Sequence, residues 1–209
     1  MDFEEKKTEL NQIRQQILAC QNCPLAKTRN IAVPGEGDYQ ASVMFIGEAP
    51  GANENEKGIP FCGAAGKFLD EMLNVIGLDR ESVFITNMVK CRPPENRDPE
   101  DEEKSACTKN YLQKQIELID PMLIICLGRH SLGYLLPVAG SISQAHGKVF
   151  KKPNGRYYLP LYHPAAALHN GGLRETLVND FKKIPVILKK IENNISKNDQ
   201  TVLRQTSLL

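Results

Sequence analysis

The sequence predicts an α/β fold in which a parallel β-sheet is covered by helices on both faces. Three observations support this prediction. Short apolar runs, each long enough for one buried strand, recur along the 209-residue chain. Segments with apolar side chains at helical spacing separate these runs. No internal repeat is present. Because strands that alternate with helices form βαβ units, the strands are expected to lie parallel to one another.

The first half of the chain contains three predicted helices and two predicted strands. Residues 4–19 repeat apolar side chains at helical spacing. Residues 42–46 form an apolar run that stops at a glycine, which indicates a buried strand. Residues 63–76 place apolar side chains on one helical face before a glycine, a common helix stop. Residues 82–86 form the second strand. Residues 98–119 begin with Asp-Pro and acidic side chains, which are typical of a helix N-terminus.

The second half continues the alternation. Residues 122–127 are the longest apolar run and predict a third strand. Residues 128–136 form a short helix that ends before a proline. Residues 148–150 and residues 157–162 predict two more strands, of which the latter belongs to the core. A last helix over residues 173–191 is interrupted by proline. We therefore predict one domain over residues 1–192 and a polar, flexible tail over residues 193–209.

Composition excludes several classes of protein. The chain is 41% hydrophobic and 24% charged with a net charge of +1, which excludes a disordered or collagen-like chain. No apolar run approaches the ~20 residues of a membrane helix. The first residues carry no secretory signal, so a reducing compartment is expected. The near-neutral charge hides an uneven distribution, because Lys and Arg outnumber Asp and Glu nine to two between residues 145 and 190. This basic half is the predicted location of a nucleic-acid backbone.

Six cysteines are many for a chain without an export signal. Cys126 lies in a predicted core strand and Cys62 in a loop, and both are interpreted as packing residues. The remaining four are candidate metal ligands: Cys20, Cys23, Cys91 and Cys107. A thioredoxin-type CxxC is expected to follow a strand, whereas this CxxC follows a predicted helix. On spacing alone, the four thiols suit either Zn²⁺ or a [4Fe–4S] cluster.

Polar side chains follow three predicted core strands. Glu48 comes after the first strand, Asn87 ends the second, and His163 follows the fourth. Ligands of open α/β sheets bind beyond the carboxyl ends of the strands, so these groups are expected to converge on one site. The glycines of residues 63–66 also place a helix N-terminus near this edge, where an anion is stabilised.

Four segments carry a specific family resemblance: residues 47–51 (GEAPG), 58–63 (GIPFCG), 86–97 (TNMVKCRPPENR) and 163–166 (HPAA). Together with the four cysteines, they resemble the iron–sulfur uracil-DNA glycosylases, family 4 of that superfamily. The resemblance runs in order from about Cys20 to the last helix. It implies a three-layer α/β/α sandwich with a central four-stranded parallel sheet, in agreement with the fold class predicted above.

The resemblance implies an enzyme of base excision repair that flips uracil out of DNA. Hydrolysis of the N-glycosidic bond then releases free uracil and leaves an abasic site. Carried over by position, the uracil-binding residues are Gly47, Glu48, Glu54, Phe61, Asn87 and His163. Phe61 is expected to stack on the base, Asn87 to read its edge, and Glu54 to obstruct the methyl group of thymine. The catalytic residues are expected to be His163, as the donor to uracil O2, with Asn96 and Glu48.

The same resemblance implies a structural [4Fe–4S] cluster on Cys20, Cys23, Cys91 and Cys107. Arg92 and Arg97 are expected to meet DNA phosphates. Residues 165–174, with Leu168 and Arg174, are interpreted as a wedge loop that contacts the DNA beside the lesion. One position departs from the family pattern, because Cys62 replaces an aliphatic residue. Ala49 stands where many other superfamily members carry a carboxylate, and a small residue there is usual in family 4.

Two other classes of protein fit the sequence less well than a glycosylase. A non-catalytic iron–sulfur or zinc DNA-binding module needs the cysteines but not the polar groups at the strand ends. A phosphate-handling enzyme needs a phosphate site such as a P-loop, which the sequence lacks. The expected partner is uracil-containing DNA, single- or double-stranded, bound by a monomer in the cytoplasm, at the nucleoid. The terminal residues 205–209 (QTSLL) resemble peptides that dock on sliding clamps, which we state as a hypothesis.

Overall fold

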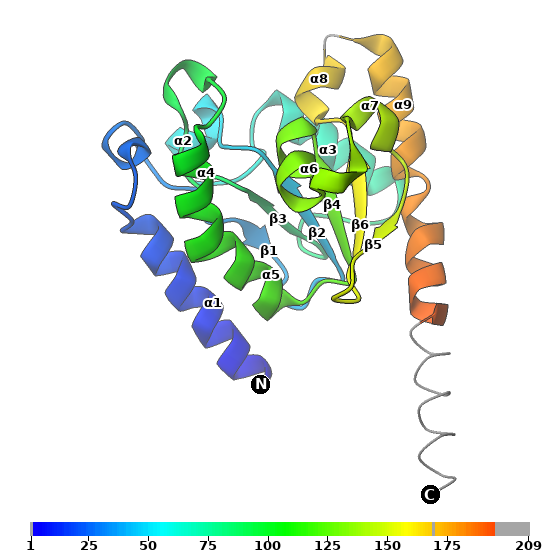
Figure 1. The fold of residues 1–209 in the computed structure, drawn as a ribbon, viewed down its shortest axis with the longest axis horizontal. Coiled ribbons are helices and arrows are strands. Elements are labelled where there is room, and N and C mark those ends of the chain that lie inside the picture. The colour runs from blue at the N-terminus through cyan, green and yellow to red at the C-terminus, as the bar shows by residue number, and fades with distance from the viewer. Residues whose placement is uncertain (1, 169, 195–209) are drawn as a thin grey trace, which may run out of the picture.

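The computed structural model of the protein describes residues 2–168 and 170–194. A central β-sheet separates two layers of helices (Figure 1), as the sequence predicts. The sheet has six strands in the order β1-β3-β2-β4-β6-β5. Within the described residues, no helix is both long and apolar enough to span a membrane.

The four predicted core strands are confirmed. They are β3 (Phe84–Asn87), β2 (Val43–Gly47), β4 (Leu123–Leu127) and β6 (Tyr157–Leu161). These strands pair in parallel, so their carboxyl ends meet at the same edge. The short strands β1 (Glu36–Gly37) and β5 (Phe150–Lys151) extend the sheet in antiparallel fashion at its two sides.

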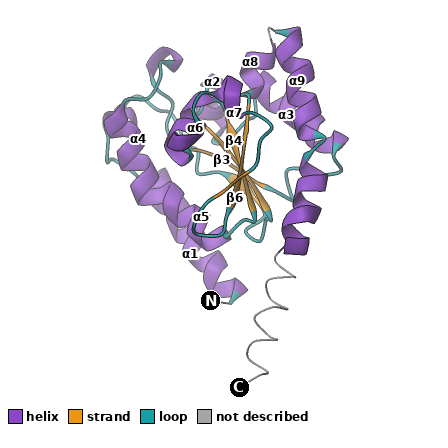
Figure 2. Ribbon diagram, turned by 45° about the vertical axis from the view of Figure 1, so that its right-hand side comes forward, coloured by secondary structure: helices purple, strands orange, loops and turns teal. Residues whose placement is uncertain are grey.

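Alternate side chains of each core strand enter different hydrophobic clusters. In β2, Met44 and Ile46 join the cluster beneath helices α1 (Phe3–Leu18) and α5 (Gln113–Ile119). Val43 and Phe45 point the other way, toward α3 (Ala64–Val75) and α9 (Gly171–Phe181). Figure 2 shows the sheet nearly edge-on between these layers. Burial on both faces explains why the strands are continuous apolar runs.

The predicted helix over residues 98–119 begins later than expected and changes its winding. Helix α4 (Asp101–Cys107) starts after Glu100, whose backbone N–H donates to the Glu103 carboxylate at 2.8 Å. The earlier residue Asp98 is excluded from the helix and pairs with Arg129 instead. A π-helical turn, Thr108–Leu112, then joins α4 to α5. The widened turn begins directly after Cys107, one of the predicted metal ligands.

Short helices complete the fold. They are α2 (Ala52–Lys57), α6 (Arg129–Leu135), α7 (Ile142–Ala145) and α8 (Pro164–Leu168), with 3₁₀ turns at Pro24–Lys27, Pro94–Asn96 and Pro137–Ala139. The predicted break in the last helix is confirmed. Helix α9 ends at Phe181, and a second helical segment covers residues 184–194, with Pro185 in its first turn. The predicted tail therefore begins within a helix, and its residues 195–209, with the proposed clamp peptide, lie outside the described residues.

Two expectations about the DNA-facing surface are wrong. Residues 165–174 do not form a loop, because α8 and α9 occupy most of this segment. Three of the nine basic residues between 145 and 190 lie away from the carboxyl edge of the sheet, so the basic excess does not gather there as a whole. Lys151 and Lys152 lie over Tyr157 and Tyr158, at the start of β6. Arg156 also precedes β6, so these charges lie at the opposite edge from His163.

Candidate active site

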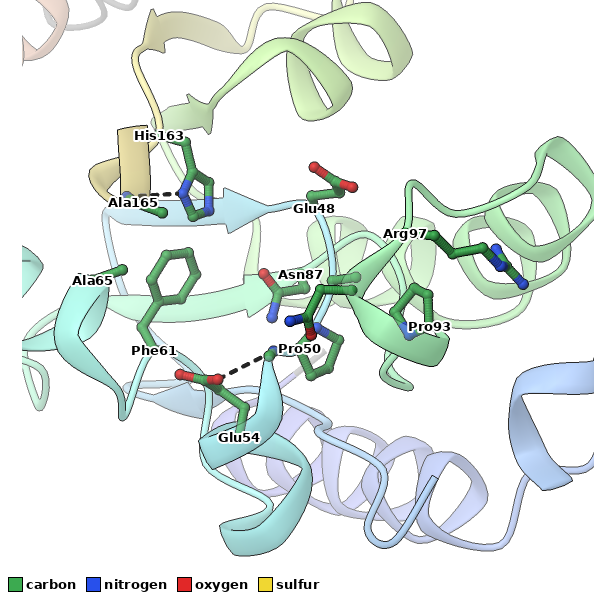
Figure 3. A pocket seen from close by; sticks show the side chains of 13 residues that line it. Glu48, Pro50, Glu54, Phe61, Ala65, Asn87, Pro93, Arg97, His163 and Ala165 are labelled. Atoms are coloured by element: carbon green, nitrogen blue, oxygen red, sulfur yellow. Dashed lines mark hydrogen bonds between the residues drawn. The ribbon is translucent and has the colours of Figure 1, made fainter. Parts of the chain in front are cut away.

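A cavity of about 350 Å³ opens beyond the carboxyl ends of the core strands. Seven of the predicted site residues line it: Glu48, Glu54, Phe61, Asn87, Asn96, Arg97 and His163. Figure 3 shows Asn87 near the centre of the cavity, with His163 and Phe61 on one side and Glu48 at the rim. The structure thus brings together residues that are up to 115 positions apart, between Glu48 and His163.

Asn87 ends β3 and lies opposite Gly47 of β2 in the sheet register. A side chain at Gly47 would place its Cβ 2.3 Å from Asn87 Oδ1 and 2.6 Å from the Phe61 ring, so only glycine leaves room for both. Asn87 Oδ1 is buried and has no hydrogen-bond partner. Among the described residues it is the only such buried side-chain atom. Buried polar atoms are nearly always paired, so this oxygen is ready to accept a hydrogen bond from a ligand.

The main chain at Asn87 is held by Lys90, which sequence reasoning missed. The Lys90 side chain is buried, and its Nζ donates to Asn87 O at 2.8 Å. The same ammonium donates to Thr86 Oγ1 at 2.6 Å and to Gln115 Oε1 at 2.7 Å. These three acceptors match the three protons of an ammonium, while burial lowers the pKa of Lys90 to about 7. Lys90 lies beside Cys91 within a recognised motif, but its sequence position gives no sign of these contacts.

Phe61 forms an apolar wall of the cavity. Its ring stacks against the His163 ring with the centroids 5.5 Å apart. The following residues turn into α3, where the Glu54 carboxylate accepts hydrogen bonds from the backbone N–H groups of Cys62 at 2.9 Å and Gly63 at 3.0 Å. The anion expected at this helix N-terminus is therefore supplied by the chain itself. Glu54 also accepts from Gly51 N at 3.1 Å, which joins two of the recognised motifs.

His163 follows β6 and reaches the cavity from the sheet edge. Its Nδ1 accepts a hydrogen bond from the backbone N–H of Ala165 at 3.1 Å. An imidazole whose Nδ1 is an acceptor carries its proton on Nε2. Burial lowers the pKa of His163 to about 4, so the ring is neutral at physiological pH. The geometry thus resolves the protonation state that the sequence leaves open, and Nε2–H is the available donor.

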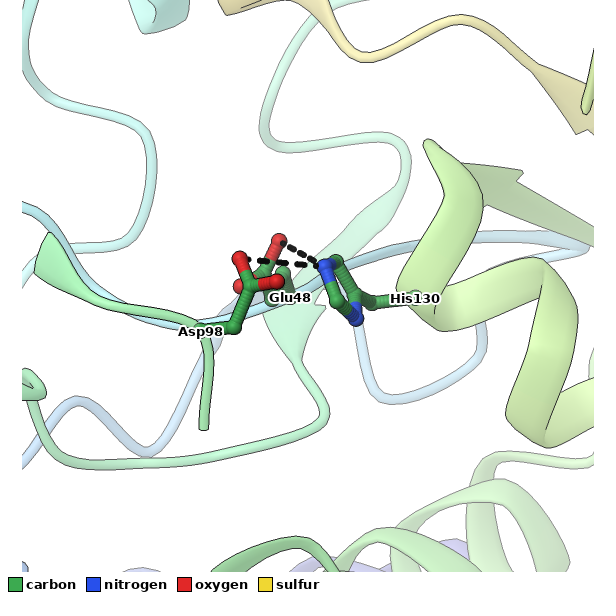
Figure 4. Close-up of side chains that lie close together, drawn as sticks. All are labelled: Glu48, Asp98 and His130. Atoms are coloured by element: carbon green, nitrogen blue, oxygen red, sulfur yellow. Dashed lines mark ion pairs between the residues drawn. The ribbon is translucent and has the colours of Figure 1, made fainter. Parts of the chain in front are cut away.

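Glu48 joins a charged network at the rim of the cavity (Figure 4). His130 Nε2 lies 3.6 Å from Glu48 Oε2 and 3.2 Å from Asp98 Oδ1. Arg129 pairs with Asp98 at 2.8 Å. Burial raises the pKa of Glu48, and the nearby His130 opposes this shift. His130 and Asp98 were not predicted as site residues, because neither belongs to a segment on which a role was placed.

Asn96 lies at the same rim and is oriented by Arg92. Arg92 Nε donates to Asn96 Oδ1 at 2.8 Å. Because arginine only donates hydrogen bonds, this contact assigns the amide, and Asn96 has its Nδ2 group to offer as a donor. Asn96 also has a positive φ of 57°, in the left-handed region that asparagine tolerates better than most residues.

The other predicted DNA contacts have protein partners in this structure. Arg97 forms a two-point ion pair with the buried carboxylate of Glu103, at 2.7 and 2.9 Å. Arg174 donates to Glu71 at 2.9 Å, and its guanidinium lies 3.9 Å from the centre of the Phe68 ring. Leu168 packs against the hydrophobic cluster beneath α3 and α9. Their contacts with DNA stay predictions.

The four cysteines that were singled out lie together beside the sheet. Cys20, Cys23, Cys91 and Cys107 line one small cavity with Tyr111. Arg29, which follows the CxxC, donates to Cys91 Sγ at 3.2 Å and to Cys20 O at 2.7 Å. Backbone N–H groups also donate to the sulfurs of Cys107 and Cys20. Four thiols surrounded by cationic and amide donors fit a metal centre that carries negative charge.

Comparison with known proteins identifies the family. The family model of the uracil DNA glycosylase superfamily matches residues 34–184, which include the cavity and all six strands of the sheet. The chain belongs to this superfamily.

Curated relatives place the chain more narrowly. It is 50% identical to the type-4 uracil-DNA glycosylase of Sulfurisphaera tokodaii over 183 residues, which cover 84% of this chain and 83% of the relative. Identity with the type-4 uracil-DNA glycosylase of Saccharolobus solfataricus is 49%, with 84% of each chain covered. Identity with that of Archaeoglobus fulgidus is 47%, covering 84% of this chain and 91% of the relative. Within the superfamily, the chain therefore falls in the type-4 group, as the sequence motifs predict.

Proposed function

We propose that this protein removes uracil from DNA by hydrolysing its N-glycosidic bond in base excision repair. The observation that carries the proposal is the unpartnered, buried Asn87 Oδ1 in a cavity that also holds an imidazole donor and an aromatic wall. A base inside a duplex is out of reach of this cavity, so the nucleotide must be flipped out or the strand must be single. Family membership and the relatives' activity support the same function.

Asn87 is proposed to read the uracil edge. Its Oδ1 accepts the N3–H of uracil, and its Nδ2 donates to O4. Cytosine presents an acceptor at N3 and a donor at C4, so both hydrogen bonds would meet groups of the wrong kind. Buried groups left unsatisfied in this way are costly, which gives a strong preference for uracil. Phe61 supplies the stacking surface, and Glu54 is proposed to exclude the thymine methyl group.

His163 is proposed to stabilise the leaving group. Breaking the N-glycosidic bond leaves positive charge on the sugar and negative charge on uracil. The Nε2–H of neutral His163 donates to uracil O2, where negative charge develops. A fixed donor aimed at charge that appears only in the transition state lowers the barrier without tighter substrate binding. Since the pKa of His163 is about 4, no proton is gained or lost by this residue near pH 7.

Glu48 and Asn96 are proposed to place the attacking water, in the absence of a carboxylate at Ala49. Asn96 Nδ2 donates to the water oxygen, while its Oδ1 stays bound to Arg92. The water attacks the anomeric carbon, and its proton passes to the Glu48 carboxylate. A carboxylate whose pKa is raised by burial is a better base than an exposed one.

We further propose that the four-cysteine site holds a [4Fe–4S] cluster. The four thiols line one cavity, and Arg29 and backbone N–H groups donate to three of their sulfurs, an arrangement that suits a cysteine-ligated cluster. When bound, the cluster would supply a cross-link between the CxxC, the segment after β3 and α4. A structural cross-link does not need the polar side chains of the cavity. Their presence favours an enzyme over a non-catalytic DNA-binding module.

The exchange Asn87→Asp tests the reading of the base. The variant loses the donor to uracil O4 and gains an acceptor for the amino group of cytosine. We expect kcat/KM on uracil to fall roughly 10- to 100-fold, the scale of an unsatisfied buried group, and the uracil-to-cytosine ratio to narrow. Single-turnover assays on matched oligonucleotides measure both. Asn74→Asp on the exposed face of α3 is the control, and an unchanged uracil-to-cytosine ratio in Asn87→Asp would remove Asn87 from this role.

A further inference from the structure

Arg80 lies outside every recognised motif, in the connection between α3 and β3. Its guanidinium is held between two carboxylates from different elements. Nε donates to Glu36 of β1 at 2.6 Å, and Nη1 donates to Asp70 of α3 at 2.8 Å. The short edge strand β1 thus supplies an anchor for this side chain. Two ion pairs in different directions fix the plane of the guanidinium.

The remaining hydrogen bonds of Arg80 go to the main chain at the aromatic wall of the cavity. Nη1 donates to Phe61 O at 3.3 Å, and Nη2 donates to Pro60 O. Phe61 has a φ of 51°, in the left-handed region that bulky side chains disfavour. Such a conformation persists only where the surroundings hold it.

The opposite side of Phe61 is held as well. The amides of the next two residues donate to Glu54, as described above. Gly66 of α3 approaches so closely that a Cβ there would lie 1.5 Å from Phe61 O. The carbonyls before the turn are therefore held by a cation, and the amides after it by an anion. Of this cation and anion, Glu54 already has a proposed part in uracil binding and Arg80 has none.

We propose that Arg80 is a positioning residue that sets the orientation of the Phe61 ring for stacking on uracil. This inference rests on the proposed function of the cavity. Arg80 acts through Phe61 and does not itself line the cavity. Lysine cannot replace it, because one ammonium cannot reach two carboxylates and two carbonyls in the geometry of a planar fork.

A double-mutant cycle tests the proposal, with Arg80→Gln, Phe61→Ala and the double variant. The two readouts are the inhibition constant of free uracil and kcat/KM on a uracil-containing oligonucleotide. We expect Arg80→Gln to raise the inhibition constant of uracil and to lower kcat/KM, each by about tenfold, because a misplaced Phe61 ring is costly in an organised site. In the Phe61→Ala background the same exchange should have little further effect, since the ring it positions is gone. Arg80→Lys should restore the melting temperature more than uracil binding.

Arg156→Gln is the matched control, because Arg156 pairs with Asp120 at 2.7 Å at the far edge of the sheet. Multiplicative effects of Arg80→Gln and Phe61→Ala would overturn the proposal, as would full recovery of uracil binding in Arg80→Lys. If Arg80→Gln does not fold, the cycle is run with Arg80→Lys in its place. Multiplicative effects of Arg80→Lys and Phe61→Ala would then overturn the proposal. Failure of the wild-type protein to release uracil would instead contradict the proposed function, so the two failures are distinguishable.

Discussion

At the scale of single residues, the site depends on side chains whose free donors and acceptors are set by their protein neighbours. His163 Nδ1 is committed to the Ala165 amide and Asn96 Oδ1 to Arg92, so each side chain has its donor to offer. Asn87 Oδ1 is left as an acceptor. Fixed donors and acceptors need no rearrangement when charge develops on the leaving base.

The His163 assignment predicts a distinctive titration. A pKa of about 4, below the ordinary 6.5, means that His163 stays neutral with its proton on Nε2 down to about pH 5. In nitrogen-15 NMR of labelled protein, we expect its Nδ1 and Nε2 shifts to stay constant between pH 8 and 5.5. Titration near 6.5, or a proton on Nδ1, would contradict the proposed donor.

The lowered pKa of His163 also makes the stability of the protein depend on pH. Because the folded state binds a proton on His163 less readily than the unfolded state, the unfolded state carries more protons between about pH 4 and 6.5. The contribution of this residue is therefore fully present above pH 6.5. It is lost as the pH falls through that window. His163→Gln should flatten this part of the unfolding free energy plotted against pH.

Sequence reasoning identified the residues that end strands or lie in recognised motifs. Glu48, Asn87 and His163 follow apolar runs, and parallel pairing brings them together. It missed Lys90 and His130 in the site and Arg80 behind its aromatic wall. Their contacts depend on tertiary placement, of which their sequence positions give no local signal.

At the scale of elements, the close approach of β2 and β3 at Gly47 leaves room for the Asn87 and Phe61 side chains. Gly47→Ala would drive a Cβ into Asn87 Oδ1 and the Phe61 ring, at 2.3 and 2.6 Å. We expect the variant to fold with a stability loss of about 1–3 kcal/mol, the usual cost of overpacking. Activity should fall much further than this loss explains. Gly133→Ala in α6 is the control, since its Cβ meets nothing within 4 Å and should favour the helix. Urea unfolding measures the stability of each variant, and uracil release measures its activity. Normal activity of Gly47→Ala would contradict the role of this contact.

The elements themselves show what periodicity can and cannot predict. The core strands and long helices follow from apolar spacing. The π-helical turn after Cys107 was missed, because one inserted residue barely changes that spacing. The late start of α4 was missed because Asp98 is a good helix cap in isolation but pairs with Arg129 and His130.

At the scale of the whole molecule, the cysteine site connects the N-terminal segment to the active-site rim. Cys20 and Cys23 follow α1, whereas Cys91 and Cys107 enclose the segment that carries Asn96 and Arg97. A group bound by all four closes a loop of this chain. Closing a loop stabilises the folded state mainly by restricting the unfolded chain.

Loss of the cluster should therefore affect stability and the rim together. We expect the purified protein to contain four irons and to absorb broadly near ~400 nm, as cysteine-ligated clusters do. Cys107→Ser should lower the iron content, the melting temperature and the protease resistance of residues 92–106. Cys126→Ser, in the core strand, is the control for a buried thiol and should keep the iron. One zinc per chain, or a colourless protein, would contradict the cluster.

The overall architecture was the most predictable feature. A parallel sheet between two helical layers follows from buried strands that alternate with helices. Edge strand β1 was not predicted, and β5 (Phe150–Lys151) is shifted from the strand expected over residues 148–150, because each has only two residues in the ladder. The placement of the basic residues was wrong, since a local excess of charge does not tell which edge of the sheet it faces.

The most direct test of the account is release of uracil from DNA. Wild-type protein and His163→Ala are incubated with an oligonucleotide that contains one uracil, without Mg²⁺ and with a chelator in solution. We predict that the wild type yields free uracil and an alkali-labile site, and that His163→Ala is slower by roughly 10²–10³, the scale of one transition-state donor. Absence of free uracil with the wild type, or an equal rate for the variant, would contradict the account.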